Sequence, residues 1–403
     1  MKKIKVVWLC HFANDEVAQK IGALNIPNLA PWITDLINLF RYKNDVELYV
    51  VSPNYYTNIL QSFLLDNIQV TLFKYRPSFI PQKATILSYN FKTTRRSVGE
   101  IIQKIQPDII HLHGSENPQY SSGILALKNK YPVLVTIQGF LHLASVPTSI
   151  IRKYIRWNMV RIERKINSKE KYFVCATKDV ENVLNKINPT SIKFDSYYPT
   201  TIPEVSAHDF PQKKYDLVYF ARISKDKGIE DFIEAVLRLK QSIGHFKAII
   251  IGGGNSKYVR HINGLIKKRQ LAENIYFAGF QPTQQDVFKL AAQAKVYVLP
   301  TYFDGLPGSI REAMYMQIPV VAYDVGGIPS FNDQKECVTL AECKNISDLV
   351  EKIKLVLNDK ARTDRLVENA YELIKNRFDN NKIYKDLIDI YNITLKKDHH
   401  EKN

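Results

Sequence analysis

The chain has 403 residues, 45% of them hydrophobic, with 18 prolines and 16 glycines spread along its length. This composition excludes a disordered or collagen-like chain, and the length predicts two globular domains. The 56 Lys and Arg residues outnumber the 40 Asp and Glu residues, which gives a formal net charge of +16. Such a charge favours nucleic acid, anionic membranes or phosphorylated small molecules as partners but does not choose among them.

The N-terminus and the cysteines bear on where the protein acts. The apolar run from Val6 to Cys10 is too short for a signal peptide, and we interpret it as a first β-strand. No apolar run reaches the roughly 18 residues that a membrane-spanning helix needs. The four cysteines are too isolated or too widely spaced for a zinc site or a disulfide framework. We therefore expect a cytoplasmic protein, whose contact with the inner face of a membrane would be peripheral.

Short apolar runs typical of strands alternate with helix-like stretches along most of the chain. In the first half, the predicted strands are Lys5–Leu9, Val46–Val51, Ile109–Leu112, Val133–Ile137 and Tyr172–Ala176, and helices are predicted at Pro31–Phe40 and Thr94–Ile105. In the second half, the predicted strands are Asp216–Phe220, Lys247–Ile251, Asn274–Phe277, Lys295–Leu299 and Pro319–Ala322. This alternation predicts two α/β domains with mostly parallel sheets, each similar to a Rossmann fold.

Three prolines between residues 197 and 214 interrupt the alternation, because neither a helix nor a central strand forms easily there. We therefore predict an N-terminal domain of residues 1–198, a linker of 199–214 and a C-terminal domain of 215–375. Residues 376–403 are predicted to form a C-terminal helix, which packs back towards the N-terminal domain, and a polar tail that frays from Lys396 onwards.

A basic turn follows the first strand of the second half, and it contains Arg222 and Lys227. Ligands of open α/β sheets bind beyond the carboxyl ends of the strands, where helix N-termini favour phosphate. A guanidinium together with an ammonium suits a diphosphate. The alternative is a solvated basic turn that binds nothing.

A second strand–loop–helix segment runs from Pro300 to Met314 and carries two carboxylates, Asp304 and Glu312. If the helix begins near Ser309, both carboxylates can face one ligand, and carboxylates accept hydrogen bonds from the paired hydroxyls of a sugar or ribose. Glycines in the same loop let the backbone approach a phosphate closely. The alternative is a helix N-terminus that merely carries favourable acidic residues.

Taken together, residues 221–228, 304–314 and 318–322 resemble, in order and spacing, the retaining family-4 glycosyltransferases of GT-B fold. The resemblance implies two Rossmann-like domains that face a central cleft. By matching position, Arg222 and Lys227 are expected to clamp the diphosphate of a nucleotide-sugar donor. Asp304, where the family usually has Glu, is expected to contact the donor sugar or to stabilise its positive charge.

The resemblance also implies the rest of the donor site. Glu312 is expected to bind the nucleotide ribose, and Phe280 belongs to a stretch that borders the base. The donor is the only small molecule implied, with no cofactor and no metal. The backbone cradle for the sugar and the β-phosphate is expected at Leu306, Pro307, Gly308 and Ser309.

The run Gly252-Gly253-Gly254 follows a strand but lacks the spacing of a dinucleotide fingerprint. We interpret Gly253 as part of a glycine turn beside the donor, and the alternative is a plain tight turn without a ligand. In the N-terminal domain, His113, Glu116 and Gln138 follow two predicted strands and are candidate acceptor contacts. Gln138 stands where many relatives have His, and since an amide cannot act as a base, it is a binding candidate only.

The segment 149–171 is basic and partly amphipathic. On a helical wheel, Ile151, Ile155 and Ile162 form an apolar face, with several cations opposite it. Such a helix can lie on an anionic membrane surface, and the alternative is a solvated helix packed on its own domain.

These observations predict an enzyme that transfers a sugar from a nucleoside diphosphate donor to a glycan or lipid-linked acceptor with retention of configuration. Synthesis of a surface polysaccharide is the process that the resemblance suggests. One alternative is a nucleotide-sugar epimerase on the same fold, which would need acid and base groups from the first domain. Another is a non-enzymatic nucleic-acid binder, although the sequence has no recognisable module of that kind, and we expect no nucleic-acid partner.

Overall fold

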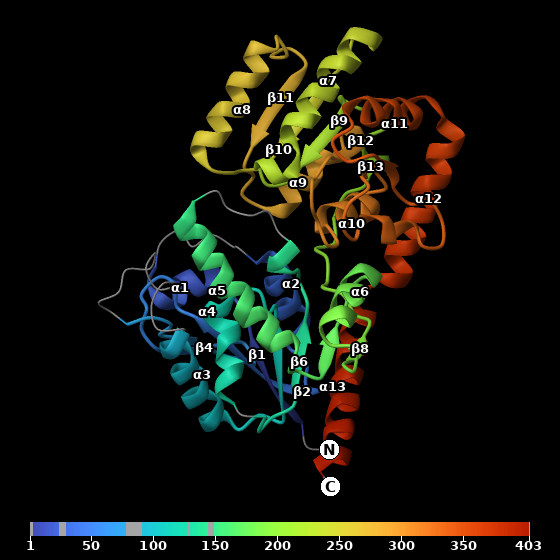
Figure 1. Cartoon of the computed structure of the whole chain (residues 1–403). Coiled ribbons are helices and arrows are strands. Elements are labelled where there is room, and N and C mark those ends of the chain that lie inside the picture. Colours follow the sequence, from blue (N-terminus) through green and yellow to red (C-terminus); the bar gives the residue numbers. More distant parts are fainter. Residues whose placement is uncertain (1–2, 24–29, 78–90, 128, 144–148, 403) are drawn as a thin grey trace. The chain divides into compact units, whose positions relative to one another are not determined.

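The computed structural model describes residues 3–23, 30–77, 91–127, 129–143 and 149–402. The chain folds as two units: residues 1–199 together with 380–403 form the first, and residues 200–379 form the second. Figure 1 shows that each unit has a sheet with helices around it. The prediction of two Rossmann-like α/β units is confirmed.

In the first unit, the described residues form an eight-stranded sheet with the order β3-β4-β2-β1-β5-β6-β7-β8. All neighbouring strands pair in parallel except β3 and β4, which are antiparallel. The strands are β1 Ile4–Leu9, β2 Val46–Pro53, β3 Gln61–Leu65, β4 Ile68–Phe73, β5 Ile109–His113, β6 Val133–Thr136, β7 Tyr172–Val174 and β8 Ile192–Phe194. The helices are α1 Asp15–Ile21, α2 Pro31–Phe40, α3 Lys92–Ile105, α4 Pro118–Ser121, α5 Ile150–Asn167 and α6 Lys178–Ile187, with 3₁₀ turns η3 Ser122–Ala126 and η4 Leu141–Leu143.

In the second unit, the described residues form a six-stranded, wholly parallel sheet with the order β11-β10-β9-β12-β13-β14. The strands are β9 Tyr215–Phe220, β10 Ala248–Ile251, β11 Ile275–Gly279, β12 Ala294–Leu299, β13 Val320–Tyr323 and β14 Thr339–Ala341. The helices are α7 Ile229–Ile243, α8 Ser256–Lys268, α9 Gln284–Ala291, α10 Gly308–Tyr315, α11 Ile346–Asn358 and α12 Lys360–Arg377, with 3₁₀ turns η5 Ala207–Asp209, η6 Lys225–Lys227 and η7 Ile328–Asn332.

The strand order of the second unit places β9 and β12 side by side at its centre. Because the two strands are parallel, their carboxyl ends meet at the same edge of the sheet, and the chain reverses order there. The central strands are buried on both sides, as expected for a parallel sheet covered by helices. Helix α7 presents Phe232, Ile233 and Val236 to this core, in agreement with the period of its apolar residues.

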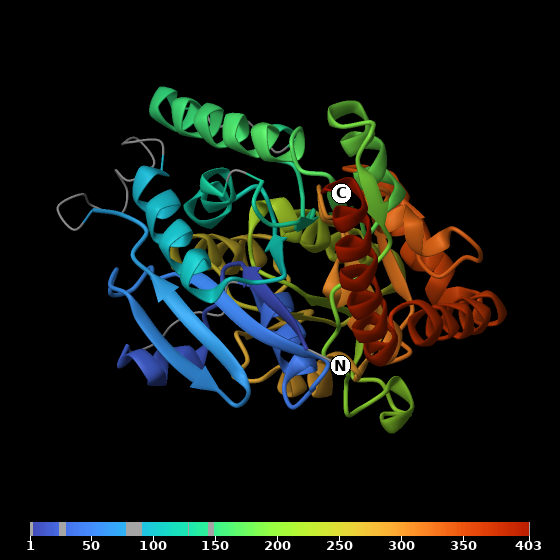
Figure 2. The same ribbon diagram turned by 90° about the horizontal axis from the view of Figure 1, so that it is seen from below.

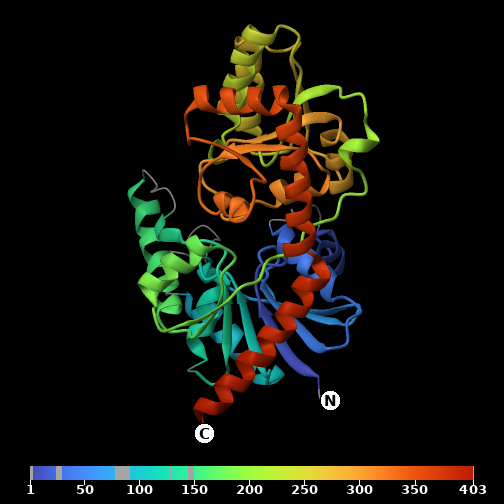
Figure 3. The same ribbon diagram turned by 90° about the vertical axis from the view of Figure 1, so that its right-hand side faces the viewer.

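The last helix, α13 Asn380–Lys402, belongs to the first unit (Figure 3). Tyr384, Leu387, Ile390 and Tyr391 pack into the core of that unit. The Trp8 indole donates a hydrogen bond to the Tyr391 hydroxyl at 2.8 Å. The prediction of a frayed tail from residue 396 is wrong in that the helix continues to Lys402, and Leu395 is the last of its described residues that packs on the core.

Candidate functional site

Two segments lie against each other at the carboxyl ends of β9 and β12. The Tyr302 amide donates a hydrogen bond to the Asp226 carbonyl at 2.9 Å. Gly228 has a φ of +67°, and a Cβ placed there would lie 1.7 Å from the carbonyl oxygen of Pro300. Only glycine permits both the left-handed backbone and this approach. The basic turn and the loop with the first carboxylate are therefore held together by the backbone.

Lys227 and Asp304 form an ion pair at this contact, with Nζ donating to Oδ2. Both side chains are about one-fifth exposed, at 21% and 19%. The loop after β13 holds Asp304 from the other side, since the Gly327 amide donates to its carbonyl at 3.0 Å. A Cβ on Gly326 would lie 2.0 Å from the same carbonyl oxygen. Asp304 is thus fixed by two loops before any ligand arrives.

Arg222 lies on the surface of the same turn, and 66% of its side chain is exposed. Its Nη2 is 3.0 Å from Asp226 Oδ2, so the contact is an exposed ion pair within one turn of chain. Such pairs contribute little to stability. The Arg222 guanidinium can therefore turn towards an anion at small cost, whereas Lys227 is already positioned.

The N-terminus of α10 supplies the third part of the site. Pro307 caps the helix, and in the described structure no side-chain cap accepts the amide hydrogens of the first turn. The hydroxyl of buried Tyr297 lies 2.7 Å from Ser309 Oγ and 3.2 Å from the carbonyl oxygen of Phe220. This contact ties the first turn of α10 to the end of β9. The free amides of a helix N-terminus bind anions well.

Glu312 lies one residue beyond the first turn of α10, because the helix begins at Gly308 rather than Ser309. It is partly buried. Burial raises the pKa of Tyr297, and Glu312 and Asp304 raise it further by their negative charges. Both carboxylates therefore lie near the same buried hydroxyl. Leu306 lies in the loop between Asp304 and the helix, and Gly308 is the first residue of the helix.

Gly253 and Phe280 lie together beside the turn after β9. A Cβ on Gly253 would lie 3.2 Å from Phe280 Cβ, and 76% of Phe280 is exposed. The Ile223 amide donates to the Gly253 carbonyl at 2.8 Å. A Cβ on Gly252 would lie 2.0 Å from the carbonyl oxygen of Ala221, so packing alone explains that glycine. The exposed ring of Phe280 therefore lies against Gly253, next to the basic turn.

In the first unit, the three predicted acceptor residues lie at the carboxyl ends of β5 and β6. Tyr198 joins two of them, since Gln138 Nε2 donates to its hydroxyl at 2.9 Å and His113 Nδ1 lies 3.2 Å from it. Burial lowers the pKa of His113 to about 3, and burial raises the pKa of Glu116 to about 8. Within the described part of the chain, buried His113 Nε2 and Glu116 Oε2 have no hydrogen-bond partner. A polar ligand that reached these atoms would satisfy them.

Sequence patterns did not single out several residues that shape these sites. Tyr198 is the last residue of the predicted N-terminal domain, directly before the predicted linker, and Tyr297 lies inside a strand. His11, just after β1, has a buried Nε2 with no partner among the described residues, and burial lowers its pKa to about 4. Its ring packs edge-on against Tyr55. Only its place after a strand could have indicated it.

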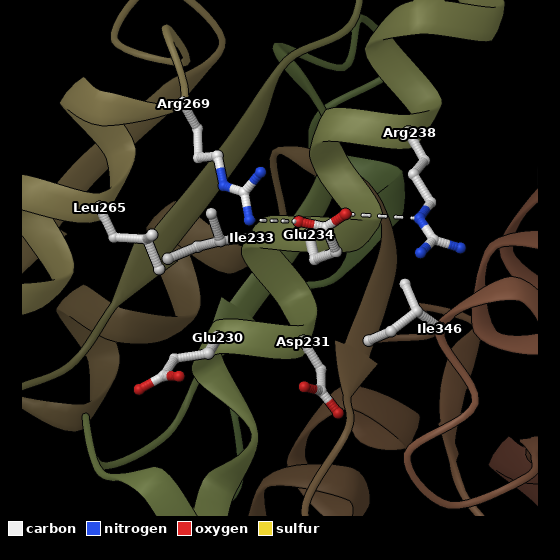
Figure 4. Close-up of a pocket in the computed structure, with 8 residues that line it drawn as sticks. All are labelled: Glu230, Asp231, Ile233, Glu234, Arg238, Leu265, Arg269 and Ile346. Atoms are coloured by element: carbon white, nitrogen blue, oxygen red, sulfur yellow. Dashed lines mark hydrogen bonds and ion pairs between the residues drawn. The ribbon is translucent and has the colours of Figure 1, made fainter.

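A separate hollow lies along α7 (Figure 4). Glu234 points between two guanidinium groups, with Oε1 3.5 Å from Arg238 Nε and Oε2 3.3 Å from Arg269 Nη2. The charge of Glu234 is thus already paired, and none of the predicted donor residues lines this hollow. The lining residues are Glu230, Asp231, Ile233, Glu234, Arg238, Leu265, Arg269 and Ile346.

Comparisons with known proteins bear on the family and the fold of this chain. The family "Glycosyl transferases group 1" matches residues 203–373, and "Glycosyl transferase 4-like" matches residues 42–170. This chain is a glycosyltransferase with a GT-B fold. Its donor-site candidates all lie inside the first of these matches, and the acceptor candidates His113, Glu116 and Gln138 lie inside the second.

Two curated relatives show the level of similarity. TuaC, a glycosyltransferase assigned to teichuronic acid biosynthesis in Bacillus subtilis (strain 168), is 23% identical over 301 residues, which is 72% of each chain. CapM, the capsular polysaccharide biosynthesis glycosyltransferase of Staphylococcus aureus, is 23% identical over 271 residues, covering 65% of this glycosyltransferase and 68% of CapM.

Solved structures share the fold at low identity. A sucrose-phosphate synthase from Thermosynechococcus elongatus has a TM-score of 0.76 at 15% identity, covering 98% of this glycosyltransferase and 100% of that chain. Anabaena Alr3699/HepE, solved in complex with UDP-glucose, has a TM-score of 0.68 at 16% identity, with 98% and 100% covered. Both comparisons show the two-domain GT-B fold.

Proposed function

We propose that the enzyme transfers a sugar from a nucleoside diphosphate donor to a hydroxyl of a glycan or lipid-linked acceptor, with retention of configuration. The observation that carries the proposal is the convergence of Lys227, Asp304 and the N-terminus of α10 at the carboxyl ends of β9 and β12. The relatives TuaC and CapM support a role in surface-polysaccharide synthesis. HepE, solved with UDP-glucose, supports a nucleotide-sugar donor.

Departure of the diphosphate is the demanding step of this reaction. The ammonium of Lys227, the exposed guanidinium of Arg222 and the free amides of α10 would stabilise the negative charge that builds up on the departing diphosphate. Loss of one preorganised group of this kind typically costs about 2.7–4 kcal/mol of transition-state stabilisation. Glu312 would accept hydrogen bonds from the ribose hydroxyls.

In the structure, Asp304 neutralises the Lys227 ammonium. A bound diphosphate would compete for that ammonium and leave the Asp304 carboxylate beside the donor sugar. There the carboxylate would stabilise the positive charge that develops as the sugar leaves. One side chain thus serves as a counter-ion before the donor binds and as a sugar contact afterwards.

On the acceptor side, Gln138 and His113 would hydrogen-bond a sugar hydroxyl, and Glu116 would offer its buried Oε2. A leaving phosphate oxygen would take the proton of the acceptor hydroxyl, so the proposal requires no protein base. It also requires no cofactor beyond the donor. Activity that survives prolonged treatment with EDTA would support this part of the proposal, and loss of activity that Mg²⁺ restores would contradict it.

Thermal unfolding with UDP, GDP, ADP and their common sugar conjugates tests the donor site directly. A ligand that binds only the native state raises the unfolding midpoint. We expect one nucleotide to raise it in the wild type and in Arg260→Ala, an exposed arginine of α8, but not in Arg222→Ala. No shift with any nucleotide would contradict the proposal.

The products decide between transfer and its alternatives. Incubation of the donor alone would convert it if the protein were an epimerase, whereas a transferase needs an acceptor. With an acceptor, NMR of the anomeric proton identifies retention or inversion. Salt-sensitive binding of DNA without any turnover of nucleotide sugars would instead favour a nucleic-acid binder.

A further inference from the structure

Helix α5 is buried along its C-terminal half and exposed along its N-terminal half. Ile162, Glu163 and Ile166 are buried, and Glu163 Oε1 accepts a hydrogen bond from the Leu141 amide at 2.9 Å. This contact fixes the helix to its own unit. Figure 2 shows α5, drawn in green, along the margin of that unit.

The exposed half carries a cluster of large apolar side chains. Ile150 is 83% exposed, and Ile151, Tyr154 and Trp157 are each more than half exposed. The sequence placed Ile151 on an apolar face with Ile155 and Ile162 and left open whether that face meets a membrane or the domain. Ile162 packs on the domain and Ile151 is exposed, because only the C-terminal half of the helix is buried.

At 100° per residue, Ile150, Tyr154 and Trp157 lie on the side of α5 opposite its buried residues. The same side continues into three exposed cations in the last turns, Arg161, Arg164 and Lys165. The Arg161 guanidinium lies 6.0 Å from the centre of the Trp157 ring. We call these six residues the α5 stripe. Its first part is apolar and aromatic, and its second part is cationic.

The charge of the helix is one-sided. Between residues 150 and 167 there are six Lys and Arg residues, and the single acidic residue, Glu163, is buried. Burial lowers the pKa of Arg95 in α3, and the nearby positive charge of Arg161 lowers it further. The surface around the stripe is therefore positive and offers an anionic partner no competing carboxylate from α5.

We propose that the α5 stripe docks the enzyme on an anionic lipid membrane. Isoleucine and tryptophan side chains enter the boundary between headgroups and acyl chains, and tyrosine lies at headgroup level. The neighbouring cations bind lipid phosphates. The opposite side of the helix stays packed on the protein, so the helix lies flat. None of the helices in the described part of the chain is long and apolar enough to cross a membrane, so this contact is peripheral.

The surface involves none of the donor or acceptor candidates, so its test needs no sugar. Full-length protein is sedimented with vesicles of phosphatidylcholine alone or with about one-third phosphatidylglycerol. The first variant is Ile150→Ser/Tyr154→Ser/Trp157→Ser, and its control is Ile202→Ser/Ile243→Ser/Tyr276→Ser, three exposed apolar residues of the second unit. The second variant is Arg161→Gln/Arg164→Gln/Lys165→Gln, and its control is Arg260→Gln/Lys267→Gln/Lys268→Gln, with the same change of charge.

We expect the wild type and both controls to bind anionic vesicles and to leave neutral ones in solution. Each surface cation contributes about fivefold to membrane partitioning, so the cation variant should bind on the order of 100-fold more weakly. The serine variant should bind at least about tenfold more weakly, because it loses three apolar contacts. Trp8 is buried and Trp32 is partly buried, whereas Trp157 is exposed. A blue shift of tryptophan fluorescence on vesicle binding therefore reports mainly on Trp157.

Three results would overturn the proposal. Equal binding to neutral vesicles, or unchanged binding by both variants, would show that the stripe does not recognise anionic lipid. A dimer in sedimentation equilibrium that the serine variant dissociates would assign the stripe to a second copy of the chain. Circular dichroism and the donor-dependent thermal shift of each variant show whether a loss of binding reflects misfolding.

Discussion

The Lys227 ammonium donates a hydrogen bond to the Asp304 carboxylate and so joins the turn after β9 to the loop after β12. The pair is four-fifths buried, and the backbone on both sides is fixed by close contacts of Gly228 and Gly326. A diphosphate at this position must therefore compete with Asp304 for the ammonium. This competition leads to a prediction in which binding and catalysis change in opposite directions.

Asp304→Asn removes one negative charge next to the proposed diphosphate position. We expect the affinity for the nucleoside diphosphate to rise by about tenfold, because the competing counter-ion is lost. The turnover number should fall by about 100-fold or more, because the charge that stabilises the donor sugar is lost too. Isothermal titration and initial rates measure the two effects. Asp364→Asn, which removes an exposed partner of Lys360, is the control. Weaker nucleotide binding by Asp304→Asn would contradict the counter-ion role.

Gly228→Ala tests the contact that brings the two loops together. Its Cβ would lie 1.7 Å from the Pro300 carbonyl oxygen at a φ of +67°, so the backbone must move. We expect a loss of more than about 3 kcal/mol in the free energy of unfolding, together with loss of nucleotide binding. Gly264→Ala is the matched control, because nothing lies within 4 Å of its Cβ. In the middle of α8 that change should stabilise the protein by up to about 1 kcal/mol. Urea unfolding of both variants provides the comparison.

The sequence predicted the elements that depend on local pattern. All ten predicted strands lie in the two sheets, because buried parallel strands are continuous apolar runs bounded by turns. The antiparallel hairpin of β3 and β4, with its half-exposed first strand, was not predicted. The apolar face of α5 was predicted, but the period of its residues cannot tell that Ile162 is buried and Ile151 exposed. That difference depends on which half of α5 packs on the domain, which is a tertiary contact.

The donor-site candidates came from motif and strand order, and the structure adds how they are joined. The ion pair of Lys227 with Asp304 links residues 77 positions apart, and no local rule pairs them. In the sequence, Tyr297 has the pattern of an ordinary core residue, and Tyr198 stands next to the predicted linker. Their roles arise because strand ends that are distant in sequence meet at one edge of a sheet.

Tyr297→Phe tests whether the buried hydroxyl positions the first turn of α10. The change leaves Ser309 Oγ and the Phe220 carbonyl oxygen without this partner. Leaving buried polar groups unsatisfied costs about 1–3 kcal/mol, and we expect that loss in urea unfolding. The nucleotide affinity should fall several-fold as Ser309 loses its fixed orientation. Tyr276→Phe removes an exposed hydroxyl of the same unit and should change neither quantity. Full nucleotide affinity in Tyr297→Phe would show that the contact serves only the core.

Glu116 predicts a specific pH dependence of stability. Burial raises its pKa to about 8 in the folded protein, from 4.5, and the charge of Glu163 adds to the rise. Between these values the folded state holds a proton that the unfolded state has released, so stability falls as the pH rises from about 5 to 8.

The variant Glu116→Gln has no such proton. It should unfold in urea much like the wild type at pH 5 but be more stable by at least about 1 kcal/mol at pH 9. Glu163 and Glu170, whose pKa values burial also raises to about 7, remain in both proteins, so the difference isolates Glu116. Glu273→Gln, an exposed carboxyl of the second unit, controls for the lost charge. A stability difference that is the same at pH 5 and pH 9 would show that Glu116 is ionised in the folded protein, and its buried oxygen would then bind the acceptor as a carboxylate rather than as a neutral acid.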